Sequence, residues 1–423
     1  PLAIAGVVII ITRKRYEGAE PSGYLGQYGE GDGDAQQYSF TMGSAGDRGG
    51  VTLSVEYFNQ DPVNAKDRWF SSNGSGTPDY PYEGWSPVSQ NGSFCDPCTP
   101  TDSAVWWTLN DGGDPAKRAD YHPITRTEYA NANEQMFLMT GIERRSVFAN
   151  ANYDISDNIT FNADVLYNHR STDQLIAGYP YQSQVFDTPL SGSSVFNPVA
   201  GQDTEFRRRL WEMPRATKSD LETYRFAGGF NGFFELAGRG WDWDVGALLN
   251  RNTSTKIARG DASLLSTKQA LGPSFINADG VAQCGTTANP VGLDACRPWN
   301  PLLPYGLAGK GSLADPELQK FLFPQYTDTG LTRTTSYTAN ISGGLFDLPA
   351  GEVGMAVGVE HRQEEGRFVP DAFAQSGNST GLAATTTAGE YSLDEVYAEL
   401  NVPLLADVAF AKELTINIAG RYS

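Results

Sequence analysis

The chain has 423 residues, of which only 19% are charged, and it contains 46 Gly, 20 Tyr, 21 Phe and 8 Trp. This composition favours strands and turns over helices, and no apolar run approaches the roughly 20 residues that a membrane-spanning helix requires, so a helical membrane protein is excluded. The net charge of −19 argues against nucleic acid as a partner, because a phosphate-binding face needs clustered Lys and Arg.

The first predicted elements surround a glycine-rich turn. Residues 24–30 and 38–44 flank Gly31-Asp-Gly-Asp34, and the two glycines suit a hairpin turn. A third strand is predicted where Val51, Leu53, Val55 and Tyr57 alternate with polar residues. This two-residue period indicates a strand with one apolar face.

Four more hairpins follow from the same alternation. They pair residues 147–155 with 159–167, 224–230 with 241–249, 337–345 with 353–359, and 396–402 with 414–418. About eleven strands result in all. Bacterial barrels close with an even number of strands, so we expect further chain beyond Ser423 to cover the open edge of the last strand.

The connections between these strands alternate in length. Tight links are predicted near 46–50, 156–158, 235–240, 347–352 and 403–412, and long loops at about 61–145, 171–221, 253–330 and 365–391. In an antiparallel meander, alternate connections lie at opposite ends of the sheet. Short periplasmic turns and long extracellular loops are typical of outer-membrane barrels.

A soluble β-sandwich is the alternative fold, since it also alternates apolar and polar residues. Its loops do not sort by length in this way. Aromatic residues near the predicted strand ends, such as Tyr57, Tyr167, Trp241 and Trp243, resemble the girdles of membrane barrels. We therefore expect an all-β fold, the antiparallel meander of a large transmembrane β-barrel, and an incomplete one.

The four cysteines form two close pairs, Cys95 with Cys98 and Cys284 with Cys296, in segments rich in Gly, Pro and Asn. Local disulfides in an oxidising compartment are the favoured interpretation. A redox CxxC motif at Cys95 is the alternative, but it needs a helix N-terminus that the surrounding residues do not provide. The chain also opens without an initiator Met or signal peptide, so we expect its natural start to lie upstream.

Three separated motifs are similar to those of TonB-dependent outer-membrane receptors. Residues 3–14 (AIAGVVIIITRK) resemble the last strand of the plug domain, although Ile9 stands where that family usually has Asn. Residues 352–362 resemble the barrel segment G-x-V-x-x-A-x-G-x-E-x-R, and residues 393–400 resemble a strand of the form x-x-E-x-Y-x-E-x. These motifs occur in the order found in the family and span nearly the whole chain.

The resemblance implies residues 1–15 as the end of the plug and residues 16–423 as the N-terminal part of the barrel. A barrel of about 22 strands is the architecture of such receptors, so about eleven strands are half of one. It further implies a Gram-negative outer-membrane protein that takes up a scarce ligand, such as a siderophore, cobalamin or a saccharide, with energy from the TonB complex. Outer-membrane lipid and lipopolysaccharide are the other implied partners, and no cofactor is expected.

Ligand contacts are expected on the outer loops, where aromatic and basic residues gather. The candidates are Trp106, Trp107, Trp211, Arg207 and Arg208, because indole rings stack on flat ligands and guanidinium groups bind anions. The alternative for the tryptophans is that they pack the loops against one another, and for the arginines that they are solvated surface charges.

Two other functions remain open from the sequence, a diffusion porin and a structural or adhesive barrel. An enzyme is not expected, because the three His are scattered and no Gly-x-Ser-x-Gly motif occurs. A metal site is not expected either, because no His has ligand spacing to the cysteines.

Overall fold

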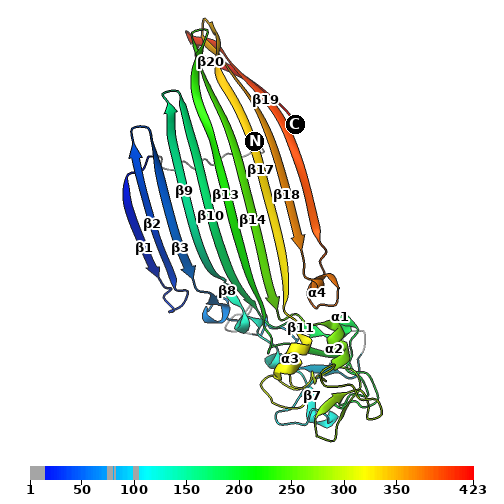
Figure 1. Ribbon diagram of the computed structural model, residues 1–423. Coiled ribbons are helices and arrows are strands. Elements are labelled where there is room, and N and C mark those ends of the chain that lie inside the picture. Colours follow the sequence, from blue (N-terminus) through cyan, green and yellow to red (C-terminus); the bar gives the residue numbers. More distant parts are fainter. Residues whose placement is uncertain (1–14, 74–79, 81, 99–103) are drawn as a thin grey trace.

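The computed structural model describes residues 15–73, 80, 82–98 and 104–423. The segment 3–14, which resembles a plug strand, lies outside these residues. Most of the described chain belongs to one long, twisted sheet, and a compact lobe of loops lies at one end of it (Figure 1).

The sheet contains eleven antiparallel strands whose spatial order follows the sequence. The all-β antiparallel meander predicted from the sequence is therefore confirmed. In the described chain, the two edge strands each pair with only one neighbour. The strands are β1 (Gly18–Gly26), β2 (Ala35–Gly46), β3 (Gly49–Gln60), β9 (Gly141–Ser156), β10 (Ile159–Ile176), β13 (Arg215–Leu236), β14 (Arg239–Arg259), β17 (Tyr326–Leu348), β18 (Gly351–Val369), β19 (Thr387–Val408) and β20 (Ala411–Tyr422).

Turns of two residues lie at one end of the sheet and longer connections at the other. The short turns are 47–48, 157–158, 237–238, 349–350 and 409–410, and the other connections are 27–34, 61–140, 177–214, 260–325 and 370–386. At the 237–238 turn both residues have positive φ, 54° for Ala237 and 76° for Gly238, as a tight hairpin turn requires. The four long connections are shorter than the sequence indicated, because the strands extend further toward this end.

The two faces of the sheet differ in chemistry, because alternate residues of each strand point to opposite sides. On one face, cross-strand neighbours such as Val245, Ala339 and Val359 continue an apolar surface, and Val245 is 40% and Val359 49% exposed. On the other face, polar neighbours such as Asn340 and Asp244 are hydrogen-bonded across strands. We call these the apolar face and the polar face.

Short elements build the connections at the lobe end. None of the helices in the described parts of the chain is both long and apolar enough to cross a membrane. The elements are β4 (Val63–Asn64), η1 (Ala65–Asp67), β5 (Ser93–Cys95), β6 (Trp106–Leu109), η2 (Arg118–Asp120), β7 (Tyr121–Pro123), η3 (Arg126–Glu128), η4 (Ala132–Gln135), β8 (Phe137–Met139), β11 (Pro180–Gln182), α1 (Ser183–Phe186), β12 (Phe206–Arg209), α2 (Leu264–Ala270), β15 (Ser274–Ile276), β16 (Ala282–Cys284), α3 (Pro316–Leu322) and α4 (Ala372–Gln375).

Candidate functional site in the loop lobe

Three long connections fold together into one body, which we call the loop lobe: the described residues of 61–140, 177–214 and 260–325. It contains a cluster of buried apolar side chains to which all three connections contribute. Because residues of all three connections share this cluster, apolar contacts between the connections hold the lobe together. The cluster is Phe94, Leu109, Tyr121, Tyr181, Leu190, Phe206, Leu210, Ala262, Ala270, Leu271, Trp299, Leu302, Leu313, Leu318, Leu322 and Phe323.

A five-stranded sheet within the lobe joins the first two of these connections. Its order is β11-β12-β5-β6-β7, in which β12 from the second connection pairs with β5 from the first. The third connection supplies Trp299, whose ring packs edge-on against Phe206 at 5.5 Å and Tyr181 at 6.0 Å between ring centres. Edge-to-face rings at this spacing add about 0.5–1.5 kcal/mol each beyond area burial.

Trp106 and Arg207 meet on this sheet, although they are a hundred residues apart. The Arg207 guanidinium carbon lies 3.7 Å from the centre of the Trp106 ring. Both side chains are half-buried, and burial lowers the pKa of Arg207 below its ordinary value. A stacked, partly desolvated guanidinium contributes about 2 kcal/mol to such a pair, so the two residues present one composite aromatic and cationic surface.

Trp107 has a similar arrangement one residue later. Its indole Nε1 donates to the backbone carbonyl of Asp96 at 2.8 Å, and the Arg118 guanidinium carbon lies 3.8 Å from the centre of the Trp107 ring. Arg118 Nε also donates to Asp96 Oδ2 at 2.9 Å. Trp107 is thereby fixed in place, and like Trp106 it keeps part of its surface.

Arg208 and Trp211 lie inside the lobe. Arg208 is 1% exposed and Trp211 7%. Arg208 Nη2 donates to Glu212 Oε1 at 2.5 Å, and the Trp211 ring packs against Tyr305 at 6.4 Å between ring centres. Of the five candidate residues, Trp106, Trp107 and Arg207 are half-buried and keep part of their surface. Arg208 and Trp211 are buried and have no surface for a ligand, which the sequence did not indicate.

Arg209 is a structural residue that the sequence did not single out. Its Nη1 donates to the carbonyl of Gly178 at 3.0 Å and its Nε to the carbonyl of Val88 at 3.3 Å. Burial lowers the pKa of Arg209 to about 10. The side chain thus ties the second connection to the first. Nothing in the Arg-Arg-Arg run of the sequence distinguishes it from its two neighbours.

Both cysteine pairs form disulfides. The Cα atoms of Cys95 and Cys98 are 4.9 Å apart, and those of Cys284 and Cys296 are 6.0 Å apart. Cys95 ends strand β5 rather than beginning a helix, so it lacks the helix N-terminus on which a redox motif depends. Cys284 ends strand β16, and its disulfide closes the segment that follows this strand.

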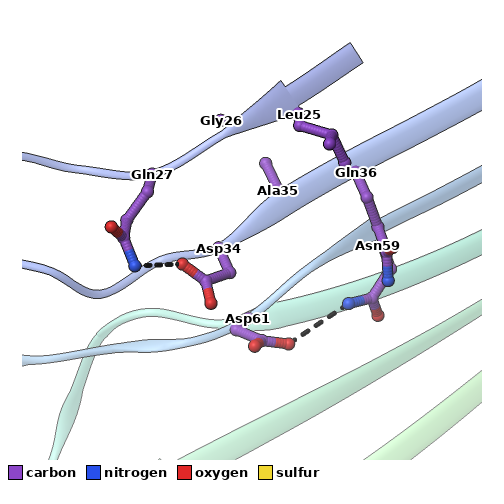
Figure 2. Close-up of a pocket in the computed structure, with 8 residues that line it drawn as sticks. All are labelled: Leu25, Gly26, Gln27, Asp34, Ala35, Gln36, Asn59 and Asp61. Carbon is purple, nitrogen blue, oxygen red and sulfur yellow. Dashed lines mark hydrogen bonds between the residues drawn. The ribbon is translucent and has the colours of Figure 1, made fainter. Parts of the chain in front are cut away.

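A polar cavity opens at the lobe end of strands β1, β2 and β3 (Figure 2). Its volume is about 510 Å³. Two carboxylates in it already accept hydrogen bonds from amides, Asp34 from Gln27 at 2.7 Å and Asp61 from Asn59 at 3.2 Å. The described residues contain no cluster of His, Cys, Asp or Glu that could hold a metal ion. The lining residues are Leu25, Gly26, Gln27, Asp34, Ala35, Gln36, Asn59 and Asp61.

The polar face of the sheet carries a network of hydrogen bonds across its strands. Arg144 of β9 donates to Glu56 of β3 through Nε at 3.1 Å and Nη2 at 2.6 Å. Thr223 donates to Asn252 at 2.8 Å, and Asn252 in turn donates to the Thr332 hydroxyl at 3.0 Å. These links join three pairs of neighbouring strands, β3 with β9, β13 with β14 and β14 with β17. A face with such polar side chains suits contact with polar groups better than a dry core.

No family model and no curated protein matches the sequence. Among solved structures, the chain is similar to the ferric-catecholate import receptor Fiu of Escherichia coli K12 in its open form, with 11% identity, a TM-score of 0.39, and coverage of 92% of this chain and 48% of that one. It is also similar to BauA, the ferric preacinetobactin receptor of Acinetobacter baumannii, with 10% identity, a TM-score of 0.39, and coverage of 91% and 42%. The siderophore receptor PiuA of Acinetobacter baumannii matches with 12% identity, a TM-score of 0.34, and coverage of 92% and 48%. The chain thus spans less than half the length of each of these three receptors.

Proposed function

We propose that this chain is part of a TonB-dependent receptor and transporter of the Gram-negative outer membrane. The observation that carries the proposal is the antiparallel sheet itself. It has one exposed apolar face and one polar face, with all five two-residue turns at one end and the folded loop lobe at the other.

The apolar face has the chemistry of a surface in contact with lipid. Apolar side chains there are left in the open, among them Phe230, Val245 and Val396, which are 40%, 40% and 46% exposed. A transmembrane strand needs about 9–11 residues. Seven strands of the large sheet have 16 to 23 residues each: β9, β10, β13, β14, β17, β18 and β19. These strands are therefore long enough to cross a bilayer and continue into the outer medium.

The polar face would then line the lumen, and the lobe would stand outside the cell. Strands β1 and β20 would need partner strands on their open edges, because unpaired backbone groups are not tolerated in hydrocarbon. TonB would act through a plug region in that lumen. The network that includes Glu56 and Arg144 offers such a region polar contacts.

For the ligand, we propose capture by Trp106, Trp107 and Arg207, without direct contact from the buried Arg208 and Trp211. The exposed parts of the two indole rings suit a flat or sugar-like surface, and Arg207 supplies positive charge beside them. A siderophore, cobalamin or a saccharide has such chemistry.

Transport can be tested with the full-length protein in cells with and without a working TonB complex. We expect the protein in the outer-membrane fraction, and ligand uptake that is lost when TonB is inactivated. Uptake of the same ligand at an unchanged rate without TonB would overturn the proposal in favour of a diffusion porin.

The capture site predicts the effect of removing both rings. Replacing Trp106 and Trp107 with Ala should weaken ligand binding to whole cells at least tenfold, about 1.4 kcal/mol, because the stacking surface is lost. Trp69→Ala is the matched control, since Trp69 is 85% exposed in the same connection but outside the cluster. Equal affinity of the double variant and the control would contradict the assignment.

A further inference from the structure

Two arginines face each other on the apolar face, close to where it ends. Arg251 of β14 and Arg333 of β17 are directly opposite in the strand register, and both are exposed. Like charges at directly opposed positions destabilise a sheet. Arg333 Nη1 is 2.9 Å from Glu365 Oε2, whereas no carboxylate of the described residues forms an ion pair with Arg251 within 4.0 Å.

An apolar groove of about 420 Å³ begins beside this pair. On the apolar face it is lined by Val165, Phe226 and Leu249, which are 48%, 39% and 46% exposed. Tyr167 and Tyr224 lie in the same cross-strand row as the arginines, because Tyr167 is opposite Tyr224 and Tyr224 is opposite Arg251. The two ring centres are 5.1 Å apart. The groove therefore joins a row of apolar side chains to a neighbouring row of aromatic and cationic side chains.

The row of residues beyond the arginines marks the end of the apolar face. Toward the lobe, the next positions with the same orientation include Glu222 of β13 and Arg367 of β18. Charged residues at this height belong at the boundary between hydrocarbon and headgroups. Arg251 and Arg333 thus lie where a lipid carries its phosphate, and the groove extends from them toward the acyl region.

We propose that this groove binds a phosphate-bearing membrane lipid. Its acyl chain lies along Val165, Phe226 and Leu249, and its phosphate is held by Arg251 and Arg333. Guanidinium groups bind phosphate through two parallel hydrogen bonds, and a bound phosphate offsets the repulsion between the opposed arginines. The proposal rests on the proposed function, in that it places the apolar face in a membrane.

The test uses the purified protein in an uncharged detergent and counts retained lipids by native mass spectrometry. Phosphatidylglycerol is the probe, and phosphatidylcholine is the comparison lipid with no net charge. The variant is R251Q/R333Q, and R251K/R333K keeps the charge without the planar donor. Lys412→Gln is the matched control, because Lys412 is an exposed cation of β20 at the tight-turn end.

We expect the wild type and Lys412→Gln to retain phosphatidylglycerol about tenfold better than phosphatidylcholine, a difference that R251Q/R333Q loses and R251K/R333K keeps in part. Equal retention of phosphatidylglycerol by the wild type and a folded R251Q/R333Q, judged by an unchanged circular dichroism spectrum, overturns the proposal. Binding of free inorganic phosphate with no preference between the lipids also overturns it. Because no transport is measured, failure of the lipid site and failure of uptake are separate results.

Discussion

At the scale of single residues, Arg208 and Glu212 form a buried ion pair in the interior of the lobe. Burial lowers the pKa of Arg208 and raises that of Glu212, and their mutual attraction opposes both shifts. Arg208 Nε and Nη1 and Glu212 Oε2 have no hydrogen-bond partner among the described residues. The pair is thus an incompletely satisfied buried ion pair, which depends on both partners being present.

Removing one partner of this ion pair should therefore destabilise the lobe more than removing both. Glu212→Ala leaves Arg208 buried and unpaired, and we expect it to lower the stability of the lobe by about 3–5 kcal/mol, measured as lost hydrogen-exchange protection over residues 206–212. Arg208→Met combined with Glu212→Leu replaces the pair with apolar groups and should be close to neutral. A single variant as well protected as the double one would contradict this account.

A second ion pair, between Arg68 and Asp32, should make the stability of the surrounding segment depend on pH. Arg68 holds Asp32 through two hydrogen bonds of 2.6 and 3.0 Å, and these bonds lower the pKa of Asp32 below its ordinary value. Because the folded-state pKa is depressed, the stabilisation is present above the ordinary pKa and is lost as pH falls through the folded value. Hydrogen exchange over residues 65–72 should accelerate in that acid range.

Asp32→Asn is the control for this titration. The amide cannot carry the charge, so exchange over residues 65–72 should already be faster at neutral pH and should lose its acid-dependent step. An acid step of the same size in Asp32→Asn would assign the titration to another carboxylate.

The sequence located some of these residues but not their roles. The close spacing of Cys284 and Cys296 predicted a disulfide that the structure contains, because a local pair depends on local chain only. The Arg207–Trp106 stack and the Arg209 contacts join separate connections. No local pattern records which loop docks on which, so these partners could not be found from the sequence.

At the scale of elements, the start of the second long connection is where the lobe joins the sheet. Gly178 follows β10, its N–H donates to Gln135 Oε1 at 3.3 Å, and its carbonyl accepts from Arg209. A Cβ atom at this position would lie 2.0 Å from the carbonyl oxygen of Leu210. The close approach of two backbone segments therefore requires glycine.

Gly178→Ala should loosen this junction without affecting the sheet. We expect a loss of about 1–3 kcal/mol, seen as faster proteolysis within residues 177–214 while the strands stay protected. Gly201→Ala is the comparison variant in the same connection. Its φ of +83° is unfavourable for alanine, but no atom lies within 4 Å of the added Cβ, so it adds backbone strain without a steric clash. If the Gly178→Ala protein is cleaved no faster than the wild type, this contact does not hold the junction.

Strand ends were the least predictable part of the fold. The sequence placed the second and third long loops at 171–221 and 253–330, whereas β10 continues to Ile176 and β14 to Arg259. Near the lobe the strands carry polar residues on both faces, such as the adjacent Ser219 and Asp220 of β13. The apolar alternation that identifies a strand stops there, although backbone pairing continues.

At the scale of the whole molecule, the difference between the two faces explains why the meander could be predicted. Along each central strand of the large sheet, residues alternate between the apolar face and the polar face. The sequence of these strands therefore keeps a two-residue period. The short strands β5 and β12 of the lobe have three and four residues. They are too short to show any period, and they were not predicted.

The same difference gives the sharpest test of the membrane assignment. Ala339 and Thr338 are neighbours in β17 and point to opposite faces: Ala339 lies between Val245 and Val359 on the apolar face, and Thr338 lies between Gly246 and Glu360 on the polar face. A lysine on a lipid-facing strand near the midplane costs about 2–4 kcal/mol. The same lysine beside Glu360 meets an opposite charge and a hydrated surface.

Ala339→Lys should therefore reduce the amount of protein recovered folded in the outer membrane, and Thr338→Lys should not. Recovery can be measured by the heat-dependent gel shift of the membrane fraction, with the two variants expressed side by side. The two substitutions share the strand, the added side chain and the charge, so only the face differs. If Thr338→Lys is depleted as much as Ala339→Lys, both faces exclude charge and the sheet packs as a soluble sandwich; if only Thr338→Lys is depleted, the lipid-facing and lumen-facing sides have been exchanged.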